Sequence, residues 1–260
     1  MAGDIAVSVD DGVATLRLCN ADRRNAISAP MWGRIADFAA TLASRDDIRV
    51  VIVRGDGALA FSAGADIAGF EEARSGAANA RGYDDLVEDT CRAIEAIAQP
   101  TLALIRGACM GAGISLAASC DLRLAADDAF FALPAARLGL GYDPRGIERF
   151  LRVFGANAAR QILLTAERIP ASRLYAIGGL HGLHPADAID TVTQTLARSI
   201  AANAPLTIKA AKAAIRALST GDANLRAAAD ELYRAADASA DYAEGRKAFA
   251  EKRPPRFTGR

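Results

Sequence analysis

The sequence has no excess charge of either sign and no long uninterrupted apolar run. Lys plus Arg number 31 and Asp plus Glu also number 31, so no net field favours nucleic acid as a partner. No apolar run approaches the roughly 18 residues of a membrane-spanning helix, since Arg106 interrupts the longest candidate. The N-terminus alternates like a strand and lacks the apolar core of a signal peptide. We therefore expect no nucleic-acid partner, no membrane partner and a cytoplasmic location.

Cysteine and histidine are scarce, and neither is arranged to bind a metal. The four cysteines show no C-x-x-C pairing, which is typical of a protein from a reducing compartment. His181 and His184 would share one face only in a helix, and Gly182 and Pro185 oppose a helix there. No cluster of cysteines or carboxylates accompanies these histidines. The sequence therefore predicts no metal site.

The spacing of apolar residues predicts an α/β protein with a helical C-terminal part. Residues 4–18 alternate around a turn at Asp10-Asp11-Gly12 and indicate a hairpin. Further strands, separated by helical patterns, are expected at 50–53, 101–105, 121–125 and 130–132. After residue 145 the strand signal nearly disappears, and helices are expected at 145–165, 171–177, 186–203, 205–219 and 222–252. The chain thus divides into a core, residues 1–200, and a helical region, residues 201–260; the stretch 69–82 is expected to be a loop.

Two turns built from small residues carry the functional argument. One is Phe61-Ser62-Ala63-Gly64-Ala65-Asp66-Ile67, and the other is Gly107-Ala108-Cys109-Met110-Gly111-Ala112-Gly113. Each follows a buried strand and leads into a helical pattern, which leaves backbone N–H groups free at a helix N-terminus. Two such turns side by side can aim two N–H groups at one oxygen and so form an oxyanion hole. The second turn lacks the third glycine of a dinucleotide fingerprint, so we do not expect a nicotinamide cofactor.

Further motifs follow these turns in a recognisable order. They are Cys120-Asp121-Leu122-Arg123, Phe131-Ala132-Leu133-Pro134 and the C-terminal Glu244 to Pro255. With the two turns, they make the chain resemble the crotonase (enoyl-CoA hydratase/isomerase) superfamily from Leu16 to Phe257. The resemblance implies a ββα spiral, a helical C-terminal region that builds a homotrimer or hexamer, and an acyl-CoA thioester substrate. Coenzyme A would be part of that substrate, and no other cofactor is expected. The Ala63 and Ala112 N–H groups would hold the thioester carbonyl.

The same resemblance implies contacts with the substrate and its coenzyme A portion. The loop Asn20 to Ala26 resembles the family's coenzyme A loop, and Lys247 and Lys252 would reach the phosphates from a neighbouring subunit. The alternative interpretation of these basic residues is that they are solvated surface charges. The alternative interpretation of Asp66 is that it is a helix N-cap. The residues implied to contact substrate or coenzyme A are Arg24, Ala26, Ala65, Asp66, Ile67, Ser115, Ala135, Lys247 and Lys252.

Two departures from the family pattern bear on the reaction. Ser115 and Ala135 occupy the positions of the two glutamates that handle water in family hydratases. Neither side chain can transfer a proton near neutral pH as a carboxylate does, so hydration by the two-glutamate route is not expected.

The nearby segment Gly141-Tyr142-Asp143-Pro144-Arg145 supplies the remaining candidates. Asp143 matches the single aspartate of some family isomerases, and in an apolar slot its pKa would be raised; otherwise it is a turn residue. Tyr142 would position the substrate and also matches a tyrosine of malonyl-type decarboxylases, although Ala65 stands where those enzymes carry histidine. Isomerisation is therefore the preferred reaction, decarboxylation the second, and a silent acyl-CoA-binding homologue the third. If neither Asp143 nor Tyr142 has the predicted role in the reaction, Glu88 and Asp89 are the next candidates for the acid or base.

Overall fold

The computed structural model describes residues 3–66 and 77–260, and it is an α/β protein, as the sequence predicts. The strands are β1 (Asp4–Asp10), β2 (Val13–Cys19), β3 (Val50–Gly55), β4 (Ala60–Ser62), β5 (Thr101–Ile105), β6 (Ala108–Met110), β7 (Leu122–Ala126), β8 (Phe130–Ala132), β9 (Ile169–Pro170) and β10 (Gly182–His184). The α-helices are α1 (Ala29–Thr41), α3 (Ala77–Ala96), α4 (Ala112–Ser119), α5 (Pro144–Thr165), α6 (Ala171–Ala176), α7 (Ile189–Ala201), α8 (Pro205–Thr220), α9 (Ala223–Asp237) and α10 (Ala240–Glu251). Short 3-10 helices lie at Ala21–Arg23, Leu42–Ser44 and Pro134–Arg137.

The described strands form two sheets. The larger has the order β1-β2-β3-β5-β7-β10, and the smaller has the order β4-β6-β8-β9. The hairpin β1–β2 is antiparallel, as is the pair β8–β9, and the remaining pairs are parallel. Asp11 and Gly12 turn the hairpin with positive φ angles of 45° and 76°. Parallel pairing aligns the carboxyl ends of β4 and β6, and each of these strands leads into one of the two small-residue turns.

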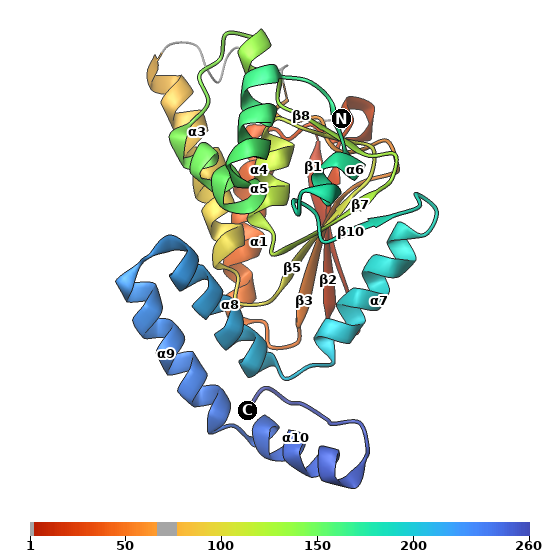
Figure 1. Cartoon of the computed structure of the whole chain (residues 1–260), viewed down its shortest axis with the longest axis vertical. Helices are drawn as coiled ribbons and strands as arrows, with labels where there is room; N and C mark the ends of the chain where they lie inside the picture. The colour runs from red at the N-terminus through yellow and green to blue at the C-terminus, as the bar shows by residue number, and fades with distance from the viewer. Residues whose placement is uncertain (1–2, 67–76) are drawn as a thin grey trace.

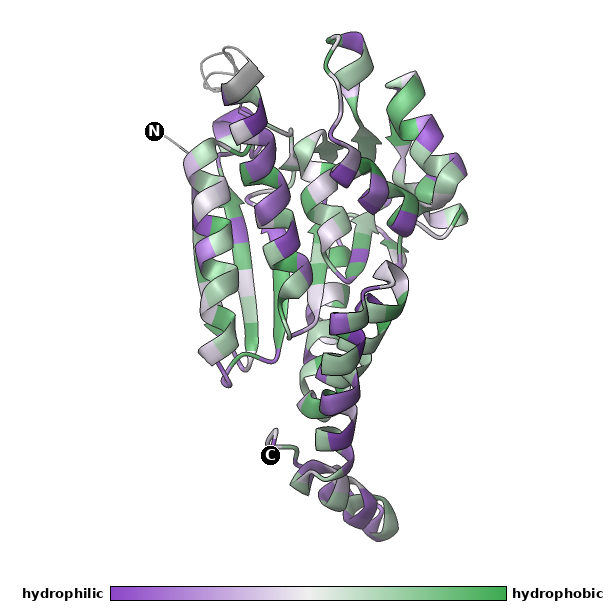
Figure 2. Ribbon diagram, turned by 90° about the vertical axis from the view of Figure 1, so that its left-hand side faces the viewer, coloured by the Kyte–Doolittle hydropathy of each residue, from purple (hydrophilic) through white to green (hydrophobic). Residues whose placement is uncertain are grey.

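Helices on both sides bury the central strands of the larger sheet. Helices α1 and α3 lie on one side and α7 on the other (Figure 1). Figure 2 shows largely apolar central strands beneath helices that carry polar residues on their outer faces. β5 is buried along its whole length, which explains why the sequence of this strand is a continuous apolar run rather than an alternating one. The largest fully buried side chains include Trp32, Phe61, Phe131, Phe150, Leu16 and Leu18.

The structure differs from the sequence-based expectation at several places, and the short strands β4, β6 and β9 were not expected. The single helix expected at 222–252 is two helices, α9 and α10, because Ser239 begins a new helix and accepts a hydrogen bond from Tyr242 N. The segment around His184 forms the short strand β10, which pairs in parallel with β7. Residues 77–82 of the expected loop belong to α3, and the rest of that stretch up to residue 76 lies outside the described residues.

The last three helices extend away from the α/β layers (Figure 1). α8 and α9 pack against each other, and Gly221, with a φ of 71°, makes the tight turn between them. Large apolar side chains on these helices are exposed to solvent in the single chain, namely Ile215, Leu218, Tyr233, Tyr242 and Phe249. The division of the chain at residues 200 and 201 stays a prediction. Within the described residues, no helix has the length and apolar character needed to cross a membrane.

Candidate active site

The two small-residue turns touch each other through their glycines. Gly64 has a φ of +99° and Gly111 a φ of +49°, conformations that other residues rarely adopt. A Cβ atom on Gly64 would lie 3.0 Å from Met110 O and 3.5 Å from the Gly111 Cα. Glycine at these positions therefore lets the two backbones approach, and the expectation that the turns lie side by side is confirmed.

Each turn contains a backbone N–H group that faces the space between the turns and has no acceptor among the described residues, and in the first turn it is not the expected one. Ala63 N donates to Arg24 O at 2.9 Å, so the prediction that Ala63 supplies the free N–H group is wrong. Ala65 N makes no hydrogen bond to any described residue. Ala112 N, at the first position of α4, likewise has no acceptor within the described part of the chain. Ala65 and Ala112 therefore supply the free donors whose residues also line a common cavity.

These two alanines line one cavity of about 150 Å³. Its wall combines backbone from both turns with side chains from α3, α4 and the segment that precedes α5. Ala63, Ser115, Ala135, Tyr142 and Asp143, all singled out from the sequence, also line it. Apolar side chains make up much of the remaining wall, namely Val87, Leu133, Leu138 and Leu140.

A pair of hydroxyl groups faces this cavity. Ser115 Oγ, on α4, lies 2.6 Å from Tyr142 Oη, in the segment before α5. The Tyr142 ring packs against Phe150, with 5.5 Å between ring centroids. Burial raises the pKa of Tyr142 well above its usual value, despite the hydrogen bond with Ser115. The tyrosine therefore stays protonated near neutral pH, so it can donate a hydrogen bond but cannot act as a base.

Asp143 is held by the helix that it begins. Its carboxylate accepts hydrogen bonds from Arg145 N at 2.8 Å, Arg145 Nε at 3.0 Å and Arg145 Nη2 at 2.7 Å. The side-chain hydrogen bonds from Arg145 lower the pKa of Asp143, and the slight burial does not reverse this. The expectation of a raised pKa is therefore wrong, because a cation two residues along the chain neutralises the carboxylate. Asp143 is the N-cap of α5 and still lines the cavity.

A buried ion pair lies at another part of the cavity wall. Glu88 lines the cavity, and its carboxylate accepts from Arg149 Nη2 at 2.8 Å; both side chains are only 3% exposed. Arg149 also donates to Glu95 at 2.8 Å. Asp89, the other reserve candidate, is exposed, pairs with Arg92 and does not line the cavity.

The residues implied to meet coenzyme A lie outside the cavity wall. Asp66 accepts from Arg23 Nη1 at 2.7 Å, and the helix that it would cap lies outside the described residues, as does Ile67. Arg24 is exposed, whereas Ala26 is buried. Lys247 and Lys252 are exposed near the end of α10, so in a single chain they do not line the cavity.

The His181 side chain has a structural role. His181 Nδ1 accepts a hydrogen bond from Arg123 N at 3.2 Å, across the sheet edge where β10 meets β7. In the described part of the chain, no group of three or more His, Cys, Asp or Glu side chains could hold a metal ion.

Comparisons with known proteins agree with this geometry. The family model described as "Enoyl-CoA hydratase/isomerase" matches residues 8–260. Among solved structures, an enoyl-CoA hydratase/carnithine racemase from Magnetospirillum magneticum superposes with a TM-score of 0.93 at 36% identity, covering 98% of this chain and 96% of that one. This match confirms the crotonase-type spiral as the fold class.

Two curated relatives carry different activity names. "Probable enoyl-CoA hydratase echA6" of Mycobacterium leprae is 33% identical over 98% of this chain and 99% of its own length. Methylmalonyl-CoA decarboxylase of Escherichia coli K12 is also 33% identical, over 83% of both chains. The family match over nearly the whole sequence, together with these relatives, shows that the chain belongs to the enoyl-CoA hydratase/isomerase family of enzymes.

Proposed function

We propose that this chain acts on an acyl-CoA thioester and stabilises an enolate of that thioester in the cavity between the two turns. The observation that carries the proposal is a pair of N–H groups, Ala65 and Ala112, which have no acceptor among the described residues and lie on one cavity wall. Both N–H groups would donate to the thioester oxygen, and the N-terminus of α4 adds a favourable dipole. Charge that develops on this oxygen would be stabilised without any movement of the backbone.

The coenzyme A portion would lie outside this cavity. We propose that Arg24 meets its phosphates from the loop before α1 and that Lys247 and Lys252 of a neighbouring copy complete the contact. Their exposure in the single chain is compatible with this role. The acyl group would then enter the cavity past Leu138, which is largely exposed.

Hydration through a carboxylate pair does not suit this cavity. Ser115 and Ala135 line it at the two positions that would need glutamate. Among the described residues, the carboxylates on the wall are instead those of Asp84, Glu88 and Asp143. Glu88 is bound to Arg149, and Asp143 is bound to Arg145. Activation of water would therefore lack the positioned pair on which the two-glutamate route depends.

Decarboxylation of a malonyl-type acyl-CoA suits it best, because this reaction needs an enolate stabiliser but no base. The bond between Cα and the departing carboxylate would break, and its electron pair would form the enolate held by Ala65 and Ala112 N–H. Carbon dioxide would leave, and Cα would then take a proton from a neutral donor. Tyr142, whose raised pKa keeps it protonated, would orient the carboxylate or supply that proton with Ser115 as its partner. The apolar wall would favour this step, because the charge leaves the compact carboxylate and becomes spread over the enolate, whose oxygen accepts from the two N–H groups.

Isomerisation through Asp143 is the second candidate. Its support is that Asp143 lines the cavity within the same segment as Tyr142. Its lowered pKa makes it a weak base, so the abstraction of a proton next to the thioester would be slow.

The test supplies the protein with methylmalonyl-CoA, crotonyl-CoA and a 3-enoyl-CoA in separate reactions and follows each product. The proposal predicts release of carbon dioxide from methylmalonyl-CoA at the highest rate. Faster conversion of the 3-enoyl-CoA would favour Asp143 and the second candidate. Tight binding of all three substrates without turnover of any would leave a silent acyl-CoA-binding homologue.

We also propose that the protein is a homotrimer or hexamer built through its C-terminal helices. The apolar side chains exposed on α8, α9 and α10 support this proposal, because soluble chains rarely expose several large apolar groups together. Phe249 is 88% exposed in the single chain. A neighbouring copy would cover it and bring Lys247 and Lys252 to the coenzyme A of another subunit.

A further inference from the structure

The cavity that Ala65 and Ala112 line is open at one end and buried at the other. Leu138 lies at the open end and is 68% exposed. Ser115 and Glu88 line the buried end, with exposed fractions of only 1% and 3%. The two alanines are half-buried between these extremes. Because the coenzyme A portion would stay outside, an acyl group held by the two alanine N–H groups would extend toward the buried end.

A hydrogen-bonded pair of side chains lies across the buried end. Ser115 follows Ala112 by three residues on α4, so the two share one face of the helix and Ser115 lies about 4.5 Å further along its axis. The contact of 2.6 Å between Ser115 Oγ and Tyr142 Oη joins α4 to the segment before α5 at this depth. The pair therefore lies about one helical turn below the point where Ala112 N–H would hold a carbonyl oxygen. We call Ser115 and Tyr142 the floor of the cavity.

The Tyr142 ring has no space to move back toward α5. A Cβ atom on Gly146, in the first turn of α5, would lie 2.8 Å from Tyr142 Cε1 and 3.1 Å from Glu88 Oε1. The ring also packs against Phe150, which is fully buried, and Glu88 is itself fixed by its ion pair with Arg149. Withdrawal of the ring would therefore disturb a close-packed part of the core, which costs free energy.

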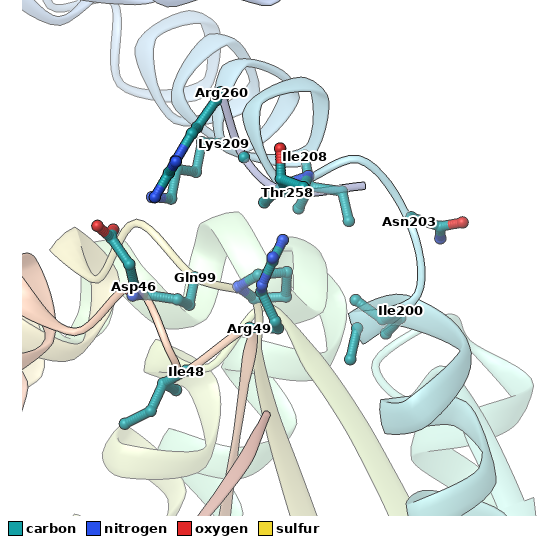
Figure 3. A pocket seen from close by; sticks show the side chains of 14 residues that line it. Asp46, Ile48, Arg49, Gln99, Ile200, Asn203, Ile208, Lys209, Thr258 and Arg260 are labelled. Atoms are coloured by element: carbon teal, nitrogen blue, oxygen red, sulfur yellow. The ribbon is translucent and has the colours of Figure 1, made fainter. Parts of the chain in front are cut away.

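The space above the floor is small. A cavity of about 150 Å³ holds a molecule about the size of benzene, which has six carbon atoms. The space does not continue into the hollow of about 90 Å³ at the amino ends of β3 and β5, which Ile48, Arg49 and Gln99 help to line (Figure 3). The two cavities have no lining residue in common. A longer acyl chain would therefore have to displace the floor or turn back toward the opening.

We propose that the floor formed by Ser115 and Tyr142 restricts this site to short acyl groups, of about six carbon atoms or fewer. This inference rests on the proposed function and adds the size class of its substrate. Each hydroxyl has one proton, and the contact between them uses one of the two, so the other is free to donate to the acyl group. A compact acyl group with an oxygen acceptor at its far end, such as a malonyl or methylmalonyl group, meets both conditions, whereas a long saturated chain meets neither.

The experiment measures binding of acetyl-, butanoyl-, hexanoyl-, octanoyl- and decanoyl-CoA to the full chain by calorimetry. These esters carry no carboxylate to lose, so their affinities report on size and not on turnover. Affinity rises from acetyl- to hexanoyl-CoA, by up to about fourfold for each methylene group that is buried. Octanoyl-CoA binds about tenfold more weakly than hexanoyl-CoA, because its chain must displace the floor. The inference is overturned if octanoyl- and decanoyl-CoA bind as tightly as hexanoyl-CoA or more tightly.

Variants separate the ring of Tyr142 from its hydroxyl. Tyr142→Ala removes the floor, so octanoyl-CoA binds at least as tightly as hexanoyl-CoA. Tyr142→Phe keeps the ring, so the size limit stays between these two esters. Leu138→Ala is the matched control, because it enlarges the open end of the same cavity, and it leaves the limit unchanged. A limit that stays in place in Tyr142→Ala, or that moves equally in Leu138→Ala, overturns the inference.

The wild-type series decides the question even if Tyr142→Ala does not fold, and it also separates this inference from the proposed function. Binding of every ester without a fall at octanoyl-CoA overturns the size limit and leaves the proposed function standing. Binding of none of the esters overturns the proposed function, and the size limit with it.

Discussion

Ser115 Oγ and Tyr142 Oη lie 2.6 Å apart on the wall of the cavity that Ala65 and Ala112 line. Ser115 stands at a position where the resemblance to family hydratases places a glutamate. A neutral hydroxyl pair therefore replaces a titratable group there. We therefore expect the cavity to be a poor catalyst of water addition, and the rate of hydration can be measured.

Hydration of crotonyl-CoA should be slow. Loss of a positioned acid or base typically removes about 10²–10⁴-fold in rate, and both expected positions lack one. Ser115→Glu combined with Ala135→Glu should raise the rate, measured as loss of the enoyl absorbance. Ser115→Gln with Ala135→Gln is the matched control, because it adds the same bulk without a carboxylate. A wild-type rate equal to that of an ordinary hydratase would show this interpretation to be wrong.

Arg149→Met should strongly destabilise the protein. The change leaves the Glu88 carboxylate buried without its partner, which typically costs about 3–5 kcal/mol. Urea unfolding gives the free energy of unfolding directly. Adding Glu88→Gln to the variant should restore part of the loss, since it removes the unpaired charge. Arg152→Met is the control on the same helix, because Arg152 is more exposed and should matter less. Equal losses in the two single variants would contradict the role given to Arg149.

Acid should weaken the C-terminal segment through Glu244. The pKa of Glu244 is lowered from its ordinary value of 4.5 to about 2. The largest cause is the hydrogen bonding from the Arg253 side chain, and the hydrogen bond from Arg256 N is the next largest. A carboxyl group with a lowered folded-state pKa contributes stability above its unfolded-state pKa and loses it as the pH falls toward the folded-state value. Glu244→Gln should therefore have a lower thermal midpoint than wild type at about pH 6 and nearly the same midpoint near pH 2. A difference that persists unchanged at low pH would argue against this ion pair as the cause.

The intact chain should be a trimer or hexamer by light scattering. Phe249→Asp should lower the measured mass of the assembly toward that of a monomer, because it places a charge in the apolar contact that we propose for α10. Leu59→Asp is the control, since Leu59 is 78% exposed but lies outside the C-terminal helices. A stable monomer of the wild-type chain, or equal dissociation by both variants, would refute the proposed assembly.

The sequence predicted the elements whose signal is local. The hairpin at Asp11-Gly12, the strand Phe130–Ala132 and each of the two glycine turns depend on a short pattern, and each was found. The choice of Ala63 over Ala65 failed because it depends on a distant loop. Residues 24–27 run alongside the first turn, and there Arg24 O accepts a hydrogen bond from Ala63 N. Nothing in the spacing of that turn reveals this pairing.

The environment of Asp143 could have been predicted from the sequence. An aspartate followed by proline and then arginine is typical of a helix N-cap, and Arg145 lies close enough in sequence to pair with it. The Glu88–Arg149 pair could not have been predicted from the sequence, because its members are 61 residues apart and only the tertiary arrangement of α3 and α5 brings them together. Strand β10 was missed because Gly182, Leu183 and His184 have low strand propensity, whereas the equally short β8 contains two phenylalanines.

The most direct test of the central claim compares Tyr142→Phe with Asp143→Asn in the release of carbon dioxide from methylmalonyl-CoA. Tyr142→Phe removes one hydroxyl and keeps the ring, whereas Asp143→Asn removes charge and basicity but keeps a group that can cap α5. Enolate formation by decarboxylation predicts a large loss of rate in Tyr142→Phe and a small one in Asp143→Asn. The opposite order, with solvent deuterium exchange into a bound acyl-CoA lost in Asp143→Asn, would contradict the account and assign the chemistry to the carboxylate.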